Sequence, residues 1–169
     1  LGTGPGRLFL IPSSVQADEI VNVLREGYDV GLLTEGFRSL IKVLNLDFLL
    51  IDTHPGLNEE TLFSIAISHA LIIIMRPDQQ DYEGTGVTVE VARSLDVPQM
   101  FLVVNKTPPA LVSADVKARV EQTYNCEVAA VLPHSDEMMT LASSGIFTLH
   151  YPDHPLTALY KEVAARLAG

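Results

Sequence analysis

DFLLIDTHPGLNEET, residues 47–61, is the stretch that decides the fold class of this 169-residue chain. An apolar run, 47–52, leads into a tight Thr-His-Pro-Gly loop, and a helix is expected to follow with Asn58 as its N-cap. A short run that is apolar throughout is typical of a strand buried on both faces of a parallel sheet. In such sheets ligands bind beyond the carboxyl ends of the strands, so Asp52 and the loop after it form the first candidate site.

The rest of the chain alternates between short apolar runs and longer amphipathic ones. Runs like 47–52 recur at 8–11, 71–75, 100–105 and 127–132, with a weaker one at 147–151. Helical patterns cover 15–26, 32–44 and 87–95, and further helices are expected from Asn58, Ser113, Ser135 and Pro155. This alternation predicts βαβ units in a three-layer α/β/α sandwich with a mostly parallel sheet. We expect residues 1–169 to form a single domain with a flexible start at 1–7.

The composition limits the classes of function. The formal net charge is −10, from 11 Lys and Arg against 21 Asp and Glu. Because a grip on nucleic acid or on an anionic membrane needs clustered basic residues, we expect no direct nucleic-acid contact by this segment. The single cysteine, Cys126, excludes an internal disulfide and fits a reducing, cytoplasmic compartment. No apolar run approaches the ~20 residues that a membrane span needs.

Two residues of the 47–61 segment suit phosphate and metal chemistry. Asp52 offers a hard oxygen ligand at the edge of the sheet, which suits Mg²⁺ bound through water. Gly56 has no side chain, so a backbone N–H there can approach a phosphate closely. The alternative is that Asp52 is an acidic strand end that only caps its loop.

With these residues in view, the chain resembles the MinD/ParA family of deviant P-loop ATPases. The strand–DTxPG–helix segment is similar to the switch II region of that family. The order and spacing of four other segments also agree: LFLIPSS (8–14), IIIMRPDQQDYEGTG (72–86), FLVVNK (101–106) and VLPHSDEMMTLASSGIFTLHYPDHPLTALYKEVAARL (131–167). The resemblance covers residues 8–167 and implies a P-loop NTPase fold with ATP or ADP and Mg²⁺ as cofactors.

The resemblance also implies roles for individual residues. Asp52 would bind Mg²⁺ through water and help to orient the attacking water. Gly56, with Thr53 beside it, would meet the γ-phosphate through the backbone. Asn105 would contact the edge of adenine, although a turn residue that satisfies its own loop is the alternative.

The loop after the run 127–132 would lie along the base, mainly through backbone atoms. Its residues are Pro133, His134 and Ser135. The family commonly has acidic or Tyr-type residues where this chain has His134 and Ser135, so an N-cap loop with no base contact is the alternative here.

Two further surfaces bear on partners. The polar segment 76–86 lies near the dimer or partner face of the resembled family, with a solvated loop as the alternative. It supplies five candidate partner contacts: Asp78, Gln79, Asp81, Tyr82 and Glu83. The last helix, 156–167, has an apolar stripe and few cations, so we expect it to pack on the sheet rather than to bind a membrane surface.

The sequence lacks the phosphate-binding loop of the resembled family. Nothing matches G-x-x-x-x-G-K-[ST], and GTGPG (2–6) contains no Lys. This chain alone is therefore expected to bind ATP weakly and not to hydrolyse it. It would be part of a longer ATPase, be completed by a separate chain, or be a stand-alone degenerate domain; we favour the first.

The function that the resemblance implies is an ATP-dependent dimerisation switch that positions cargo in cell division, in partitioning of chromosomes or plasmids, or in placing polar structures. It implies a homodimer formed with ATP and a protein partner or activator. A non-catalytic regulatory domain that kept the fold is the alternative. A metal-cluster assembly or nitrogenase-reductase-like protein is a third interpretation, and Cys126 alone does not supply its cluster ligands.

Overall fold

The computed structural model describes residues 6–12 and 30–168, which belong to two compact units, Leu1–Asp52 and Thr53–Gly169. In the first unit, α2 spans Val30–Leu44, and Arg7 Nη2 donates a hydrogen bond to the Leu44 carbonyl oxygen (3.4 Å). The second unit contains the remaining elements: α3 (Glu59–Ile67), β1 (Ala70–Met75), α4 (Gln79–Ser94), β2 (Gln99–Thr107), α5 (Ser113–Tyr124), β3 (Glu127–Pro133), α6 (Asp136–Leu141), α7 (Phe147–His150) and α8 (Pro155–Ala168). The single domain over 1–169 stays a prediction, and the flexible start falls mostly on residues outside those described.

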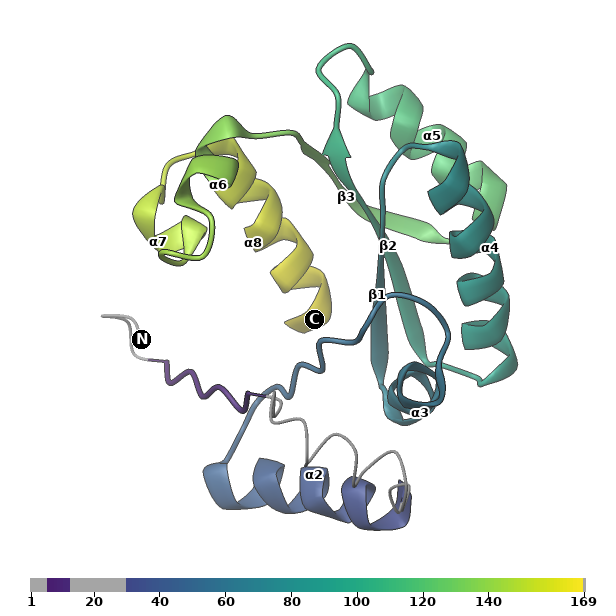
Figure 1. The fold of residues 1–169 in the computed structure, drawn as a ribbon, viewed down its shortest axis with the longest axis vertical. Helices are drawn as coiled ribbons and strands as arrows, with labels where there is room; N and C mark the ends of the chain where they lie inside the picture. Colours follow the sequence, from purple (N-terminus) through teal and green to yellow (C-terminus); the bar gives the residue numbers. More distant parts are fainter. Residues whose placement is uncertain (1–5, 13–29, 169) are drawn as a thin grey trace, which may run out of the picture. The chain divides into compact units, whose positions relative to one another are not determined.

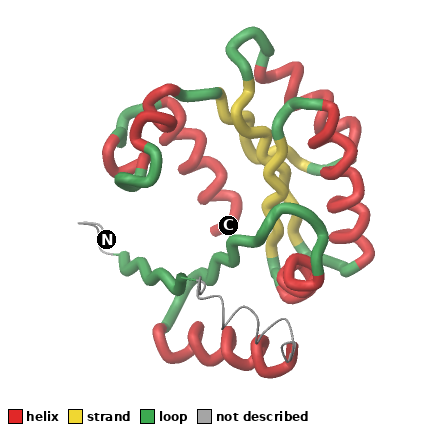
Figure 2. Tube along the Cα trace, in the orientation of Figure 1, coloured by secondary structure: helices red, strands yellow, loops and turns green. Residues whose placement is uncertain are grey.

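The sheet of the second unit is parallel, with strand order β1-β2-β3 (Figures 1 and 2). Ile73 pairs with Leu102, and Val104 pairs with Val131. Helices α4 and α5 connect consecutive strands, which is the βαβ arrangement that the alternating pattern predicts. All three strands therefore end at one edge, where the loops after Met75, Thr107 and Pro133 gather.

Helices cover both faces of this sheet. Figure 1 shows α4 and α5 on one face and α8 on the other. The first face is packed with Val89, Val116 and Val120 against Leu102 and Val128. The second face is packed with Phe147 and Leu156 against residues that include Val103, Ala129, Ala130 and Leu132. The predicted α/β/α fold class is confirmed.

Two of the predicted strands are wrong. Residues 8–11 and 47–52 belong to no helix or strand, and they expose apolar side chains: Leu10 is 81% and Leu50 is 79% exposed. A run that is apolar on both sides is stable as a strand only when neighbours pair with it and cover both faces. In the part of the chain that the structure describes, no strand pairs with either run.

Several helix boundaries also differ from prediction. Helix α4 begins at Gln79 rather than near 87, because Asp78 caps it by accepting a hydrogen bond from the Asp81 N–H (3.0 Å). Residues 147–150, expected as a weak strand, form the short helix α7. Helix α5 has Val112 as its N-cap, not Ser113.

Other helix predictions are confirmed. Asn58 caps α3 by accepting from the Thr61 N–H (2.8 Å), and Ser135 caps α6 by accepting from the Met138 N–H (3.1 Å). Pro155 opens α8. The helix predicted at 15–26 lies outside the described residues.

Candidate functional site

A cavity of about 190 Å³ lies where β2 and β3 end. Its walls come from the carboxyl ends of these strands and from α6 and α8, which can be followed in Figure 1. The lining residues are Asn105, Lys106, Pro133, His134, Ser135, Met138, Met139, Leu156 and Tyr160. Four residues that the sequence singled out, Asn105 and the loop 133–135, therefore meet in one space.

The end of β2 is irregular, and this irregularity sets the position of Asn105. The pairing of β2 with β3 shifts register between Val104 and Thr107, and Lys106 has a positive φ of 54°. The Lys106 N–H donates to the Oδ1 atom of Asn105 (2.9 Å). A bulge of this kind re-aims a side chain at the end of a strand. The side chain of Asn105 thus stabilises its own turn through Oδ1. Its amide NH₂ group still has two N–H donors beside the cavity.

The loop after β3 is held by its backbone and by a helix cap. The His134 N–H donates to the Thr107 carbonyl oxygen (3.0 Å), which ties the ends of β2 and β3 together. The Ser135 hydroxyl accepts from the Met138 N–H and donates to the Glu137 carboxylate (2.9 Å). His134 Nε2 lies 3.3 Å from Asp136 Oδ1. Ser135 is therefore the N-cap of α6 and also lines the cavity, and contact of this loop with a base stays a prediction.

Sequence reasoning missed the apolar wall of the cavity. Met138 and Met139 come from α6, and Leu156 and Tyr160 come from α8. Burial raises the pKa of the Tyr160 hydroxyl. Leu156 and Tyr160 belong to the apolar stripe of the last helix, but the stripe alone does not distinguish a residue in the core from one that borders a cavity. Apolar walls with a few polar groups at one end suit a flat heteroaromatic ligand.

The boundary between the two units falls within the DTHPG loop, after Asp52. Asp52 is exposed, and it has no ion pair among the described residues. Gly56 has a φ of 95°, and a Cβ atom built there would meet nothing within 4 Å. This backbone conformation favours glycine, and the open space leaves room for a ligand at the backbone. Thr61 Oγ1 donates to the His54 carbonyl oxygen (3.4 Å), which attaches the loop to α3.

A metal at this loop would depend on one carboxylate. Within residues 6–12 and 30–168, no three His, Cys, Asp or Glu side chains come together as a metal-binding group. An exposed carboxylate suits Mg²⁺ that keeps most of its waters, and it does not suit a fully protein-ligated ion.

Three of the five candidate partner contacts have structural roles of their own. The Arg76 guanidinium donates to both oxygens of Asp81 (3.2 Å each), and these hydrogen bonds lower the pKa of the Asp81 carboxyl. Asp78 caps α4, and Tyr82 stacks on Tyr124, whose hydroxyl donates to the Tyr82 carbonyl oxygen (2.7 Å). The other two, Gln79 and Glu83, are exposed. Partner contact by any of the five stays a prediction.

Comparison with known proteins identifies the fold of this chain. No family model matches the chain. The uncharacterized ATP-binding protein MJ0547 of Methanocaldococcus jannaschii is 24% identical over 167 residues, which cover 98% of this chain and 60% of that protein. Among solved structures, the MinD cell division protein of Aquifex aeolicus has a TM-score of 0.71 at 14% identity, over 82% of this chain and 60% of its own. The chain has a MinD/ParA-like fold.

Two further structures agree with this assignment. A ParA family ATPase from Chlorobium tepidum TLS has a TM-score of 0.69 at 16% identity, over 93% of this chain and 62% of its own. A chain of the MinC:MinD cell division protein complex of Aquifex aeolicus has a TM-score of 0.68 at 14% identity, over 82% of this chain and 59% of its own. The MinD/ParA-like chain thus spans about 60% of the length of the proteins that it matches. Among its described residues, no helix is long and apolar enough to cross a membrane.

Proposed function

We propose that the chain carries the base-binding and switch II parts of a nucleotide switch of the MinD/ParA kind, which binds ATP and hydrolyses it to ADP and phosphate. The observation that carries this proposal is the cavity where Asn105 meets the loop 133–135 at the carboxyl ends of parallel strands. The name of the Methanocaldococcus jannaschii relative, which includes ATP binding, supports the same ligand.

The polar end of the cavity suits the edge of adenine. The Asn105 NH₂ group donates to a ring nitrogen such as N7, and Oδ1 has a second lone pair with which to accept from the exocyclic amine. Backbone atoms of Pro133, His134 and Ser135 line the base, while Met138 and Tyr160 supply apolar contact. Among the lining residues there is no carboxylate to accept from the N1–H and the 2-amine of guanine, which favours adenine.

The phosphate end of the proposed site is the DTHPG loop. Asp52 would hold Mg²⁺ through water, and the backbone of Thr53 and Gly56 would approach the γ-phosphate. When bound, Mg²⁺ neutralises charge on the β- and γ-oxygens. Hydrolysis also needs a lysine-bearing phosphate loop, and no such motif stands in this sequence. We therefore propose ATPase activity for a protein in which such a loop lies beside Asp52, Thr53 and Gly56.

The cellular role follows from the same proposal. ATP promotes formation of a homodimer, and hydrolysis separates the two chains. A protein partner or activator distinguishes the dimer from the separated chains. Such a switch in the cytoplasm would position cargo in cell division or in DNA partitioning. Two of the similar structures are cell division proteins, and in one of them MinD is complexed with MinC. The exposed pair Gln79 and Glu83 is proposed to contact the partner, together with Asp78, Asp81 and Tyr82.

A regulatory domain without catalysis is the second candidate. The absence of a lysine-bearing phosphate loop from this sequence favours it. In that function, the chain would bind a protein through the same fold and would have no measurable affinity for ATP.

Titration of the 15N-labelled chain with MgATP, followed by amide NMR shifts, separates the two candidates. We expect saturable shifts at the ends of β2 and β3, at the start of α6 and in the DTHPG loop, and much smaller shifts with MgGTP. The Asn105→Ala variant should lose them, and Gln122→Ala, an exposed position on α5, should keep them. The absence of saturable shifts would refute nucleotide binding by this chain and favour the regulatory domain.

A further inference from the structure

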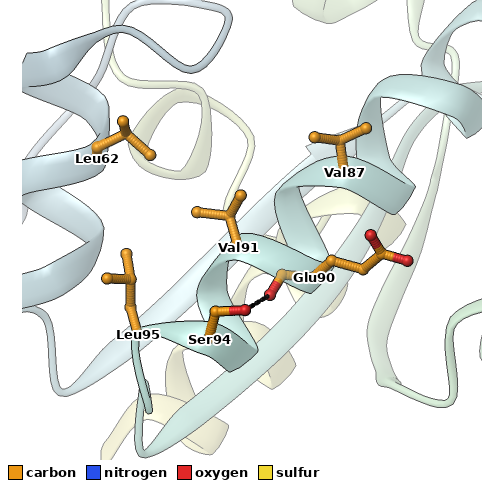
Figure 3. Close-up of a pocket in the computed structure, with 6 residues that line it drawn as sticks. All are labelled: Leu62, Val87, Glu90, Val91, Ser94 and Leu95. Atoms are coloured by element: carbon orange, nitrogen blue, oxygen red, sulfur yellow. Dashed lines mark hydrogen bonds between the residues drawn. The ribbon is translucent and has the colours of Figure 1, made fainter.

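The second unit has two concave surfaces, and they differ in their polar groups. The larger one encloses about 380 Å³ between α3 and α4. It is lined by Leu62, Val87, Glu90, Val91, Ser94 and Leu95. Figure 3 shows that Glu90 is the one charged residue of this lining and that the Ser94 hydroxyl bonds to the Glu90 backbone (2.9 Å). The cavity at the ends of β2 and β3 is different, because polar groups join the starts of α6 and α8, the two helices that form its wall.

The start of α8 is capped by a histidine. His154 stands immediately before Pro155, the first residue of this helix. Because proline has no N–H, the first donor of the helix is the Leu156 N–H, and it donates to His154 Nδ1 (3.0 Å). The usual cap residues, Ser, Thr, Asp and Asn, do not change charge near neutral pH. An imidazole nitrogen accepts a hydrogen bond only while it carries no proton, so this cap exists only in the neutral form of His154.

The other nitrogen of this imidazole faces a carboxylate. His154 Nε2 lies 3.9 Å from Glu137 Oε2 of α6. The same oxygen of Glu137 accepts a hydrogen bond from the hydroxyl of Ser135, the N-cap of α6 (2.9 Å). A line of polar groups therefore runs from the Leu156 N–H through His154 and Glu137 to Ser135. It connects the starts of α8 and α6, and both Ser135 and Leu156 line the cavity.

Aromatic rings hold the imidazole of His154 in this position. The ring of Phe147 in α7 meets it edge to face, with the two ring centroids 5.2 Å apart and an angle of 85° between the planes. The centroid of the Tyr151 ring, just after α7, lies 6.4 Å away. The titratable groups that face His154 are thus Glu137 from α6 and the Tyr151 phenol, and Asp153 adjoins it in the chain.

We propose that His154 is a pH-sensitive cap that couples proton uptake to the cavity wall. A proton on Nδ1 points directly at the Leu156 N–H, so the hydrogen bond between them is lost. The positive charge is also unfavourable at the N-terminus of a helix, whereas the carboxylate of Glu137 attracts it through Nε2. Protonation therefore exchanges the partner of His154 in α8 for its partner in α6.

The exchange of partners has a consequence for the cavity. Leu156 is 2% exposed, so water does not readily replace the lost acceptor of its N–H, and the first turn of α8 must move. Leu156 and Tyr160 of this helix both line the cavity, and its wall then moves with them. Imidazole side chains ordinarily take up a proton near about pH 6.5, which puts the change in the physiological range. The proposal does not depend on nucleotide binding.

NMR spectra of the 15N-labelled full chain between about pH 5 and pH 8 test this proposal. The Hε1 proton of His154 reports the charge of its ring, and the Leu156 amide reports the cap. Both should follow one transition with the same midpoint, and the Leu156 amide proton should move upfield as the pH falls, because it loses its hydrogen bond. Its protection against hydrogen exchange, corrected for the intrinsic effect of pH, should fall roughly fivefold, since loss of a cap costs about 1 kcal/mol.

Three variants make the test specific. His154→Asn keeps a side-chain oxygen that accepts from the Leu156 N–H and does not titrate, so this amide should stay protected at every pH of the series. His154→Ala has no acceptor and should leave the amide unprotected throughout. Glu137→Gln removes the carboxylate that attracts the imidazolium and should move the transition to lower pH.

Two other histidines provide matched controls. His134 lines the cavity, and His150 lies on α7. His134→Asn and His150→Asn should each leave the Leu156 transition in place. The proposal is overturned if the Leu156 amide shows no transition, if its midpoint differs from that of the His154 ring, if the transition persists in His154→Asn, or if either control variant removes it.

Discussion

Asn105 is the residue at which the nucleotide-binding interpretation and the turn-residue interpretation can be separated. Its Oδ1 atom accepts a hydrogen bond from the Lys106 N–H, while its NH₂ group is proposed to donate to adenine. The Asn105→Asp variant keeps an oxygen that can accept from Lys106 and loses both amide donors. The Asn105→Ala variant loses the acceptor and the donors together.

The two variants should therefore differ in stability and agree in affinity. Loss of the hydrogen bond to Lys106 should cost about 1 kcal/mol of unfolding free energy in Asn105→Ala. For a chain of this size, that lowers the melting temperature by roughly 2–4 °C. Asn105→Asp should unfold close to the parent chain. Loss of paired contacts with adenine costs about 1–3 kcal/mol, so both variants should bind MgATP roughly 5–150 times more weakly.

Urea unfolding and NMR-detected MgATP titration measure the two quantities on the same samples. The Gln122→Ala variant on α5 is the control for both. If Asn105→Asp binds MgATP as well as the parent chain does, the amide donors do not contact the base. If Asn105→Ala is destabilised and yet binds normally, Asn105 is only a turn residue and the proposed base contact is refuted.

Three further predictions concern the loop after Asp52 and the start of α4. Asp52→Asn should abolish the increase in ATP affinity that Mg²⁺ produces, measured by titration with and without chelator; a persistent Mg²⁺ effect would contradict the role of Asp52. Gly56→Ala should lower the unfolding free energy by roughly 1–2 kcal/mol, because φ is 95° and no clash is involved, and an unchanged urea midpoint would contradict this. Hydrogen bonds from Arg76 lower the pKa of the Asp81 carboxyl. This pair therefore stabilises the fold at a pH above the ordinary pKa of Asp, and that stabilisation is lost as the pH falls through the lowered pKa of Asp81. Asp81→Asn should therefore be less stable than the parent chain at about pH 7 and should approach it at about pH 3, as urea midpoints at the two pH values will show.

Local signals in the sequence predicted most of the second unit. Continuous apolar runs marked β1, β2 and β3, and the polar caps Asn58 and Ser135 marked the starts of α3 and α6. Because the strands are parallel, their carboxyl ends meet at one edge. That topological fact is why Asn105 and Pro133, 28 positions apart in the sequence, could be expected to lie together and do so.

The errors arise where structure depends on partners that a local pattern does not show. The runs 8–11 and 47–52 have the composition of buried strands, but a strand also requires a neighbour with which to pair. The polar residues 79–86 look like a loop, yet the Asp78 cap and the buried Thr85 hold them in a helix. The cavity wall from Met138 to Tyr160 depends on how α6 and α8 fold back on β3, which periodicity alone cannot specify.

The central claim is that the cavity at the ends of β2 and β3 holds the adenine base. Intermolecular NOEs between the H2 and H8 protons of adenine and this chain test that claim most directly, since they report contacts shorter than about 5 Å even for a weakly bound ligand. The account predicts NOEs to the methyl groups of Met138 and Met139 and to the ring protons of Tyr160. NOEs from adenine to residues elsewhere in the chain, or none at saturating MgATP, would contradict it.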